Sequence, residues 1–249
     1  MFDFNKIQAL HEATKASISI PLDPSTWPDN WKKIEFKEYK RLKRIYLPKI
    51  STQGMPSLNE VLKTRSSSRY FNSSELISIE TVSSLLNFSA GAREDMKTAL
   101  NLASRFYPSA GARYPLEIYI ALRNIEKIEN GIYHYNIKEH ALEKILSEKS
   151  GQKIRTIISE TWARDAQMLI VITSKFGQML SKYGGRGYRF NLLEAGALME
   201  NFYLVSKALG LGCCALGKSI DGEIDEILNL TSEEENTLCL LAVGVSKIQ

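Results

Sequence analysis

The longest periodic pattern of apolar positions in the chain runs from Leu192 to Leu209. Apolar or small residues recur there every three or four positions, and a second apolar stripe runs beside the first. Two stripes predict a helix that is buried on more than one face and ended by Gly210. Gly196 lies in mid-helix, where glycine costs about 1 kcal/mol relative to alanine, so we expect another backbone to approach it closely. A subunit-interface helix and a core helix of a monomer both satisfy this pattern.

Shorter patterns predict the remaining helices and strands. A capping box at Ser57 and Glu60 starts one helix, and Ser78 starts another that ends near Gly91. Further helices are predicted at 150–163 and 221–228, and strands from Leu116, from Gly131 towards Leu142, at 168–173 and at 238–244. The stretch 92–105 is polar and weakly patterned, which indicates a mobile loop. An antiparallel hairpin combined with long helices predicts an α+β fold.

Length and composition narrow the function classes. The 249 residues suffice for one large core or two small domains, and 44% hydrophobic with 24% charged residues is ordinary for a globular protein. The net charge of +4 is too small to indicate nucleic-acid binding and suits a site for a phosphate or an acidic peptide. The sequence shows no apolar run of membrane-spanning length and no signal-peptide core. Three cysteines, two of them adjacent, fit neither a disulfide framework nor a zinc site, which predicts a reduced, cytoplasmic protein without a metal.

The first 50 residues are predicted to form an N-terminal arm, followed by one domain at 51–249. Three prolines accompany two tryptophans in this arm, which indicates an extended, aromatic-pinned segment: Pro21, Pro24, Pro28, Trp27 and Trp31. Basic and aromatic residues alternate from Lys32 to Lys49, but Glu35 and Glu38 dilute the charge. A solvated arm is therefore favoured over a nucleic-acid-binding segment.

An adjacent pair, Lys182 and Tyr183, precedes a glycine-rich stretch and carries the first candidate chemistry. Neighbouring side chains converge only in irregular backbone, which Gly184, Gly185 and Gly187 can supply. An ammonium about 4 Å from a phenol, at an effective dielectric constant of about 20, is worth about 4 kcal/mol, or roughly 3 pKa units. The pair could therefore act as a general base, with either partner losing the proton. A solvated lysine beside an interfacial tyrosine is the alternative.

Two further stretches have the composition of ligand-binding loops. Arg65 and Arg69 bracket three hydroxyls, Ser66 to Ser68, which could cradle a phosphate through guanidinium and hydroxyl donors but could equally form a polar turn. Small residues between Pro108 and Pro115 would let backbone approach a flat ligand, although a simple turn into a strand explains them as well.

Residues 212–219 match the phosphate-binding loop of nucleoside triphosphatases letter for letter. That loop requires a preceding strand and a parallel sheet, whereas a long helix precedes it here and only about 30 residues follow. We therefore reject nucleoside-triphosphate binding.

The string Lys-Tyr-x-x-Arg-Gly-Tyr-Arg-x-x-Leu-Leu-Glu-x-Gly from Lys182 resembles the signature of the SagB/McbC-type azoline dehydrogenases. These are flavin oxidases of thiazole/oxazole-modified peptide pathways, within the nitroreductase superfamily. Pro-Ser-x-Gly-Ala-x-Tyr-Pro-x-Glu from Pro108 resembles the same group, and Arg-x-Ser-x-Arg from Arg65 is similar to a nitroreductase phosphate motif. Ala197 and Glu200 stand where the group often has His and Gln.

The resemblance covers nearly the whole chain and implies a three-layer sandwich, a mostly antiparallel sheet flanked by helices. It also implies a homodimer with FMN at its interface and an arm that wraps the partner. By this match the cofactor contacts are Arg65, Ser66, Ser67, Arg69, Ser109, Gly111, Arg113, Leu216, Gly217 and Lys218, with Leu216 and Gly217 contributing main chain. Lys182 and Tyr183 would be catalytic, and Lys247 is the one basic residue left for a C-terminal phosphate contact. Glu194 could cap or orient the Lys-Tyr loop, although a purely structural role is slightly favoured.

The implied function is the FMN-dependent oxidation of thiazoline or oxazoline rings in a ribosomally made peptide to thiazole or oxazole. Cyclodehydratase and precursor-recognition subunits would be its partners. Two alternatives are a general NAD(P)H-dependent nitro or quinone reductase, and a non-catalytic scaffold subunit of a cyclodehydratase complex. The Lys-Tyr pair argues against the reductase, because such a reduction needs no base on the substrate.

Overall fold

The computed structural model describes residues 3–15, 23–29, 36–50, 54–97, 103–218 and 221–247. Several positions used in the sequence analysis lie outside these ranges: Pro21, Trp31, Lys32, Glu35 and Ser219. No helix in the described ranges combines the length and the apolarity that crossing a membrane requires.

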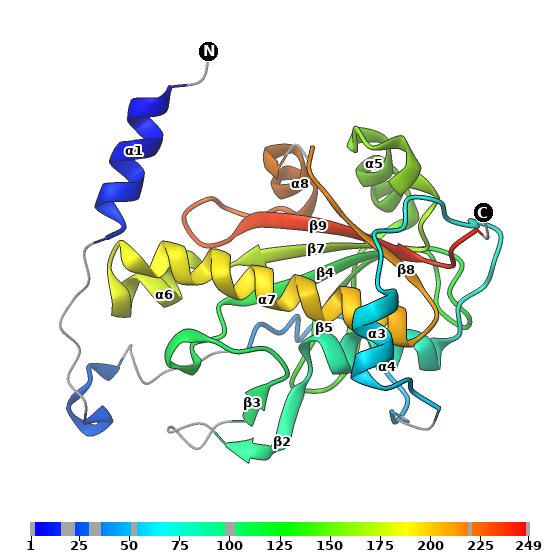
Figure 1. Cartoon of the computed structure of the whole chain (residues 1–249), viewed down its shortest axis with the longest axis horizontal. Helices are drawn as coiled ribbons and strands as arrows, with labels where there is room; N and C mark the ends of the chain where they lie inside the picture. Colours follow the sequence, from blue (N-terminus) through cyan, green and yellow to red (C-terminus); the bar gives the residue numbers. More distant parts are fainter. Residues whose placement is uncertain are drawn as a thin grey trace.

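A seven-stranded antiparallel sheet forms the centre of the molecule (Figure 1), in the order β1-β6-β5-β4-β7-β9-β8. The strands are β1 (Arg44–Tyr46), β4 (Leu116–Leu122), β5 (Gly131–Asn136), β6 (Ala141–Ser147), β7 (Met168–Ser174), β8 (Gly212–Leu216) and β9 (Asn236–Gly244). Every residue of β4 and β7 is buried, because helices cover both faces of the sheet there. This explains their continuous apolar sequences.

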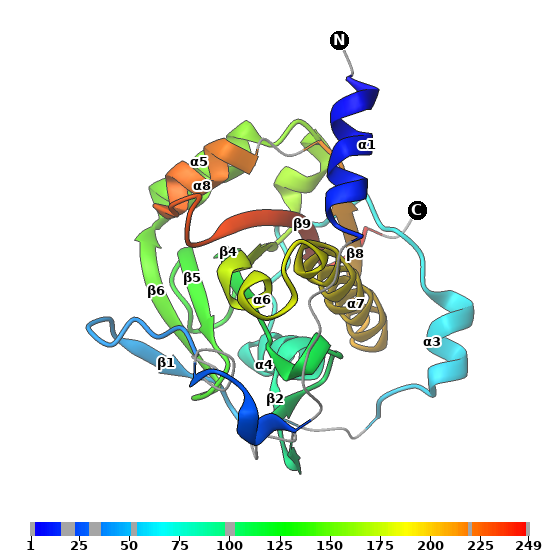
Figure 2. The same ribbon diagram turned by 90° about the vertical axis from the view of Figure 1, so that its left-hand side faces the viewer.

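Two apolar cores lie on opposite faces of this sheet, which makes three layers (Figure 2). One core packs α4 (Ile79–Ala90) and α7 (Arg186–Ala208) against the sheet, and the other packs α5 (Glu148–Ile157) and α8 (Asp221–Leu228). The remaining helices are α1 (Phe4–Ala13), α3 (Leu58–Thr64), α6 (Phe176–Tyr183) and the short 3-10 turns η1 (Pro24–Thr26), η2 (Ala110–Ala112) and η3 (Thr161–Asp165). The predicted α+β sandwich is confirmed.

The helix α7 is longer than its sequence pattern predicts, and one of its faces is open. It begins at Arg186, six residues before the first apolar stripe, and Gly210 follows its end with φ +73°. Leu193 is 70% exposed, and a Cβ placed on Gly196 would meet no atom within 4 Å. The open space at Gly196 is what close approach by another chain would require.

The prediction of a loop at 92–105 is wrong. Residues Ala92–Lys97 and Ala103–Arg105 form an antiparallel hairpin, β2 and β3 (Figure 1). Arg105 holds this hairpin, because its backbone N–H donates to the Tyr114 hydroxyl (3.0 Å) and its guanidinium donates to the Tyr107 hydroxyl (2.6 Å). The charged residues of β2 gave no apolar alternation from which a strand could be recognised.

The described residues 36–46 are not a solvated arm, and this prediction is corrected. The Lys37 ammonium lies 2.6 Å from both the Glu235 carboxylate and the Tyr119 hydroxyl, and β1 joins the edge of the sheet beside β6. The carboxylates that receive this segment are buried, so they require cationic or hydrogen-bonding partners. The helix α1, by contrast, projects from the body (Figure 1) and has no buried residue.

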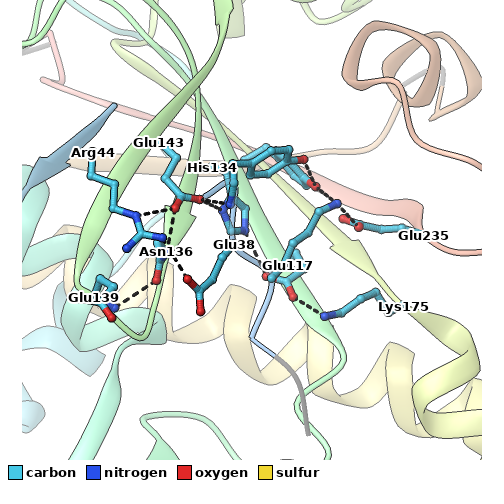
Figure 3. Close-up of polar contacts among 12 residues, drawn as sticks. Glu38, Arg44, Glu117, His134, Asn136, Glu139, Glu143, Lys175 and Glu235 are labelled. Atoms are coloured by element: carbon cyan, nitrogen blue, oxygen red, sulfur yellow. Dashed lines mark hydrogen bonds and ion pairs between the residues drawn. The ribbon is translucent and has the colours of Figure 1, made fainter. Parts of the chain in front are cut away.

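A fully buried histidine, His134, lies beside the segment 36–46, with its ring centre 5.2 Å from that of Tyr39. His134 Nδ1 is 3.0 Å from Glu143 and Nε2 is 3.2 Å from Glu117, and both carboxylates have a second cation, Arg44 and Lys175 respectively (Figure 3). Burial alone would lower the pKa of His134, but the hydrogen bonds to the two carboxylates raise it instead. The imidazole is therefore held in its charged form by a balanced buried network.

Candidate functional site

Lys182 and Tyr183 occupy the last turn of α6, not the irregular loop that their sequence suggested. Gly184 ends the helix with φ 55° and ψ −147°, so the glycine-rich stretch turns the chain into α7 instead of carrying the pair. The Lys182 Nζ nevertheless lies 5.4 Å from the centre of the Tyr183 ring. The two side chains converge because both extend from the end of a helix towards the same neighbouring segment.

That neighbouring segment is the turn at Gly111. A Cβ built on Gly111 would lie 2.3 Å from the Tyr183 Oη and 2.9 Å from the Lys182 Nζ, and its φ is +59°. Only glycine fits there, on both steric and conformational grounds. The structure thus brings one predicted flavin contact, from the Pro108–Pro115 motif, against both predicted catalytic residues.

Burial determines the protonation state of the pair. Lys182 is only 1% exposed, and burial, aided by the nearby positive charge of Arg113, lowers the pKa of its amine to about 8. Burial raises the pKa of Tyr183, and Arg113 offsets that only in part. The lysine is therefore the partner that loses its proton first, whereas the phenol stays protonated.

Arg113, another predicted flavin contact, is itself enclosed at this site. Its side chain is 1% exposed, its Nε donates to the Gln178 carbonyl (3.0 Å), and the Gln178 amide donates to the Arg113 carbonyl. This reciprocal pair ties the motif segment to α6. In this structure Arg113 acts on the pair through its charge.

A cavity of about 320 Å³ adjoins the pair. It is lined by Pro108, Ser109, Ala110, Phe190, Leu193 and Glu194. Phe190 connects the cavity to the pair, because its ring packs edge-on against Tyr183 with centroids 5.0 Å apart. The cavity therefore lies where a ligand would meet both motifs.

Glu194 fixes one wall of this cavity. The Ser109 hydroxyl donates to its carboxyl (2.6 Å) and accepts from the Tyr114 N–H (2.8 Å), so the motif segment is held onto α7. Burial raises the pKa of Glu194 to about 8, against the opposing effects of Ser109 and Arg105. The Glu194 carboxyl is therefore mostly neutral at pH 7.

The second group of predicted contacts lines a separate cavity of about 530 Å³. It is lined by Ser66, Ser67 and Arg69 from the stretch after α3, by Lys207 of α7 and by Lys247 after β9. Three cations with serine hydroxyls form a donor set suited to a phosphate monoester, such as that of FMN. Lys207 belongs to no motif, and only its place in the last turn of α7 could have suggested it.

Arg65, also a predicted phosphate contact, is not one of the residues that line this cavity. Its guanidinium lies 5.5 Å from the centre of the ring of Tyr203, which does line it.

The predicted contacts at Leu216, Gly217 and Lys218 line neither cavity. Leu216 ends β8, and its side chain packs in the core beneath α5 and α8. The backbone N–H groups of Gly217 and Lys218 both donate to one Glu160 carboxylate oxygen, at 2.9 and 2.8 Å. Within this chain, a carboxylate thus occupies the donors that the resemblance assigns to a flavin.

The two cavities lie towards opposite ends of α7. Figure 1 shows α6 at one end of this helix and α3 and β8 at the other. Phe190 and Glu194 face the Lys182 end, near α6, whereas Tyr203 and Lys207 face the phosphate-type cavity, near α3 and β8. Seventeen residues of helix separate Phe190 from Lys207, which corresponds to about 25 Å. The nearest lining residues of the two cavities on this helix, Glu194 and Tyr203, are nine positions or about 14 Å apart, so the two groups are separate clusters along α7.

Comparisons with known proteins identify the family of this chain. Residues 62–245 match the profile of the Nitroreductase family. A Methanocaldococcus jannaschii protein assigned to the nitroreductases is 32% identical over 188 residues, 75% of this chain and 90% of the relative.

Two further relatives process peptides. The trifolitoxin-processing protein TfxB of Rhizobium leguminosarum bv. trifolii is 26% identical over 175 residues, 67% of this chain and 47% of TfxB. The microcin B17-processing protein McbC of Escherichia coli is 31% identical over 133 residues, 51% of this chain and 48% of McbC. This chain thus matches about half the length of each.

Solved structures show the same fold at lower identity. A crystal structure of a nitroreductase-type protein from Anabaena variabilis gives a TM-score of 0.77 at 21% identity, covering 99% of this chain and 48% of that one. A chain of the E. coli microcin synthetase McbBCD complex with truncated pro-MccB17 gives 0.63 at 22% identity, covering 98% and 93%. From its sequence match and its fold, this chain belongs to the nitroreductase family, as a distant homologue of McbC and TfxB.

Proposed function

We propose that this chain is an FMN-dependent dehydrogenase that oxidises thiazoline or oxazoline rings of a ribosomally made peptide to thiazole or oxazole. One observation carries the proposal: a buried lysine amine with its pKa lowered to about 8 lies against the Gly111 turn and beside a ligand-sized cavity. A reductase of nitro groups or quinones needs no base, whereas aromatisation of an azoline does.

In the proposed reaction, neutral Lys182 removes the Cα proton of the ring and becomes an ammonium. The Tyr183 phenol, which stays protonated, donates a hydrogen bond at the same turn and orients the ring for this transfer. Phe190 and Leu193 give the cavity an apolar wall. Bound FMN would supply the acceptor for the hydride that the ring loses together with this proton, and dioxygen would take up the two electrons afterwards.

The residues around the 530 Å³ cavity suit the FMN phosphate. Arg69, Lys207 and Lys247 supply positive charge, and Ser66 and Ser67 supply hydroxyl donors. The residues that would contact the flavin ring, Ser109 and Gly111, lie at the other end of α7.

A homodimer resolves this separation. If two copies pack their α7 helices antiparallel across Gly196, the Lys182 end of one helix lies beside the phosphate-type cavity of the other. The exposed Leu192 and Leu193 would then be buried, and the open space at Gly196 would receive the partner's backbone. The apolar stripe of Phe4, Ile7 and Leu10, exposed on the projecting α1, is suited to grip the same partner. Each active site would then combine two chains.

The peptide substrate and the partner subunits follow from the relatives. McbC and TfxB are named as processing proteins of a microcin and of trifolitoxin, and the McbBCD structure contains a truncated precursor peptide. We infer that this chain likewise acts on a peptide, alongside cyclodehydratase and precursor-recognition subunits.

The test is an assay of the FMN-loaded protein on a synthetic peptide with one thiazoline ring, followed by mass spectrometry. The expected product has lost two hydrogen atoms, and Lys182→Ala should lower its rate of formation by about 10²- to 10⁴-fold while FMN stays bound. Lys153→Ala, on the exposed face of α5, is the matched control and should behave as the original protein. Equal rates for Lys182→Ala and the control would refute the proposal.

The second candidate is a general NAD(P)H-dependent nitro or quinone reductase, favoured by the 90% coverage of the Methanocaldococcus relative. Rapid NAD(P)H oxidation with a nitroaromatic acceptor, unaffected by Lys182→Ala, would establish it in place of the azoline reaction. A protein that binds no FMN at all would favour the scaffold role.

A further inference from the structure

The N-terminal stretch of the chain places an aromatic ring directly on the proposed base. Trp27 follows η1, and the Lys182 Nζ lies 3.4 Å from the centre of its ring. Trp27 is separated by more than 30 residues from the start of the family match at residue 62. Trp27 belongs to none of the three sequence motifs, which begin at Arg65, Pro108 and Lys182.

The turn that presents Trp27 is locally fixed. The Asp23 carboxylate accepts from the backbone N–H of Ser25 (2.9 Å) and from its hydroxyl (2.7 Å), and the Asp23 carbonyl accepts from the Thr26 hydroxyl (2.8 Å). These bonds close the single turn of η1 and set the direction in which the chain continues into Trp27. The indole is therefore presented by an ordered turn.

Trp27 encloses the amine together with Gly111. A Cβ on Gly111 would lie 2.9 Å from the Lys182 Nζ, so the backbone of the motif segment bounds the amine, and the indole face bounds it as well. Two described titratable groups face the Lys182 amine: Arg113, beside η2, lowers its pKa, and the centre of the Tyr183 ring, on α6, lies 5.4 Å from its Nζ. An indole face attracts a cation, and its bulk also removes water from the amine.

We propose that Trp27 is a positioning residue of the active site, which holds the Lys182 amine against the Gly111 turn and shields it from water. This inference rests on the proposed role of Lys182 as the base. It extends the functional site into the N-terminal stretch, so that a segment outside the family match sets the state of the residue that removes the proton.

The two actions of the indole have opposite effects on the amine. Shielding from water lowers the pKa of Lys182, which is about 8 instead of 10.5, whereas attraction by the ring face raises it. Since burial is the principal cause of the lowered pKa, removing the ring should raise the pKa by one to two units. A phenylalanine would retain both actions in weaker form.

The experiment is pulse labelling of Lys182 with a water-soluble amine reagent between pH 6 and pH 11, read by peptide mass spectrometry. The plateau rate at high pH reports access to the amine, and the midpoint reports its pKa. Trp27→Ala should raise the plateau rate at least tenfold and move the midpoint upward by about one to two pH units, and Trp27→Phe should restore most of both. Tyr46→Ala, an exposed aromatic residue on β1 in the same N-terminal stretch, is the control and should match the original protein.

An unchanged midpoint in Trp27→Ala, with circular dichroism showing a folded protein, would overturn the inference. Labelling requires neither flavin nor peptide, so it is independent of the azoline assay. A shifted midpoint with no azole formed by the original protein would leave the environment of Lys182 as inferred and reject the proposed reaction. An unchanged midpoint, together with azole formed by the original protein, would reject the role of Trp27 and support the proposed reaction.

Discussion

At the scale of single residues, burial lowers the pKa of Lys182 and raises the pKa of Tyr183. Both shifts have the same chemical consequence. Burial favours the neutral amine and the neutral phenol, and Arg113 reinforces the effect on the amine. A neutral amine can accept a proton and a neutral phenol can donate a hydrogen bond. The two neighbours thus have complementary roles without sharing a proton.

This predicts the pH dependence of the reaction. Because Lys182 must be deprotonated, the rate of azole formation should rise with pH through a midpoint near 8, where the pKa of the amine lies. Arg113→Met should move this midpoint upward, because it removes a like charge. Rate measurements from pH 6 to pH 10 check this, and a midpoint that stays in place or falls in Arg113→Met would contradict it.

The buried Glu194 carboxyl predicts a pH-dependent stability. Its pKa in the folded protein, about 8, exceeds the ordinary value of 4.5, so its favourable contribution is complete below pH 4.5 and is lost as pH rises towards 8. The loss is roughly 1.4 kcal/mol per pH unit at most. Glu194→Gln should abolish this slope between pH 5 and pH 8 in urea unfolding. An identical slope in the two proteins would show that the carboxyl is charged when folded.

At the scale of the elements, α7 has a face that the rest of the chain leaves uncovered. Its buried positions pack on the sheet, whereas Leu192, Leu193 and Gly196 border open space. Each of the two apolar stripes contains both kinds of position. Phe202 and Leu198 lie in the core, whereas Leu192 and Leu193, at the start of the stripes, are exposed.

Gly196→Leu should separate folding from association. Within the chain the new side chain meets no atom, and leucine favours helix over glycine by almost 1 kcal/mol, so thermal stability of the monomer should not fall. In an α7–α7 dimer the same side chain would hold the backbones apart, so analytical ultracentrifugation should show a shift to monomer.

Gly222→Leu provides the control, because Gly222 lies on α8 and is also bordered by open space. It should leave the association state unchanged. A Gly196→Leu protein that dimerises as tightly as this control would exclude α7 as the interface.

The docked segment 36–46 depends on the His134 network. Burial alone would raise the pKa of Glu143, but hydrogen bonds from His134 and Asn136 lower it to about 2, and Arg44 pairs with the same carboxylate. Glu143→Gln would leave buried positive charge uncompensated, so it should lower the free energy of unfolding at pH 7 by about 3–5 kcal/mol.

The pH dependence of this contribution has a defined sign. The folded pKa of Glu143 is depressed, so its stabilisation is complete above pH 4.5 and disappears as pH falls towards 2. Urea unfolding at pH 7 and pH 3 should therefore show a smaller difference between Glu143→Gln and the original protein at the lower pH. An equal difference at both values would mean that the loss arises from packing.

Strands with continuous apolar sequence, such as β7 and β9, could be predicted, because burial on two faces leaves a plain signal. The hairpin β2–β3 and the segment 36–46 could not, because their stability comes from polar contacts, which leave no apolar periodicity in the sequence. Arg105 needs Tyr114, and Lys37 needs Glu235, nearly 200 positions away. Local periodicity holds no information on such pairs.

At the scale of the whole molecule, the candidate site consists of two groups at the ends of one helix. The sequence motifs identified most members of each group, because contacts within a motif are local. They did not reveal that α7 holds the groups apart, since that separation follows from the length and path of the helix. Lys207 and Trp27 were missed as site residues for a related reason, because each reaches the site from a stretch without a motif.

A mixed dimer tests whether the groups combine across two chains. Lys182→Ala and Arg69→Glu should each be inactive alone. After unfolding and refolding together in equal amounts, half of the dimers carry one of each chain, and each mixed dimer holds one site with both residues intact. Azole formation should therefore return to about a quarter of the original rate, whereas sites built within single chains would give none.

The position of β9 between β7 and β8 imposes an order on biosynthesis. On the ribosome, β1, β4, β5, β6 and β7 can pair as soon as they emerge, but β8 has no place in the sheet until β9 has been translated. Because Gly212 and Cys213 of β8 line the phosphate-type cavity, that cavity cannot close around a cofactor during most of translation. A nascent chain stalled before residue 236 should therefore remain unable to retain FMN, and the temporarily unpaired edge of β7 would be a site for chaperone capture.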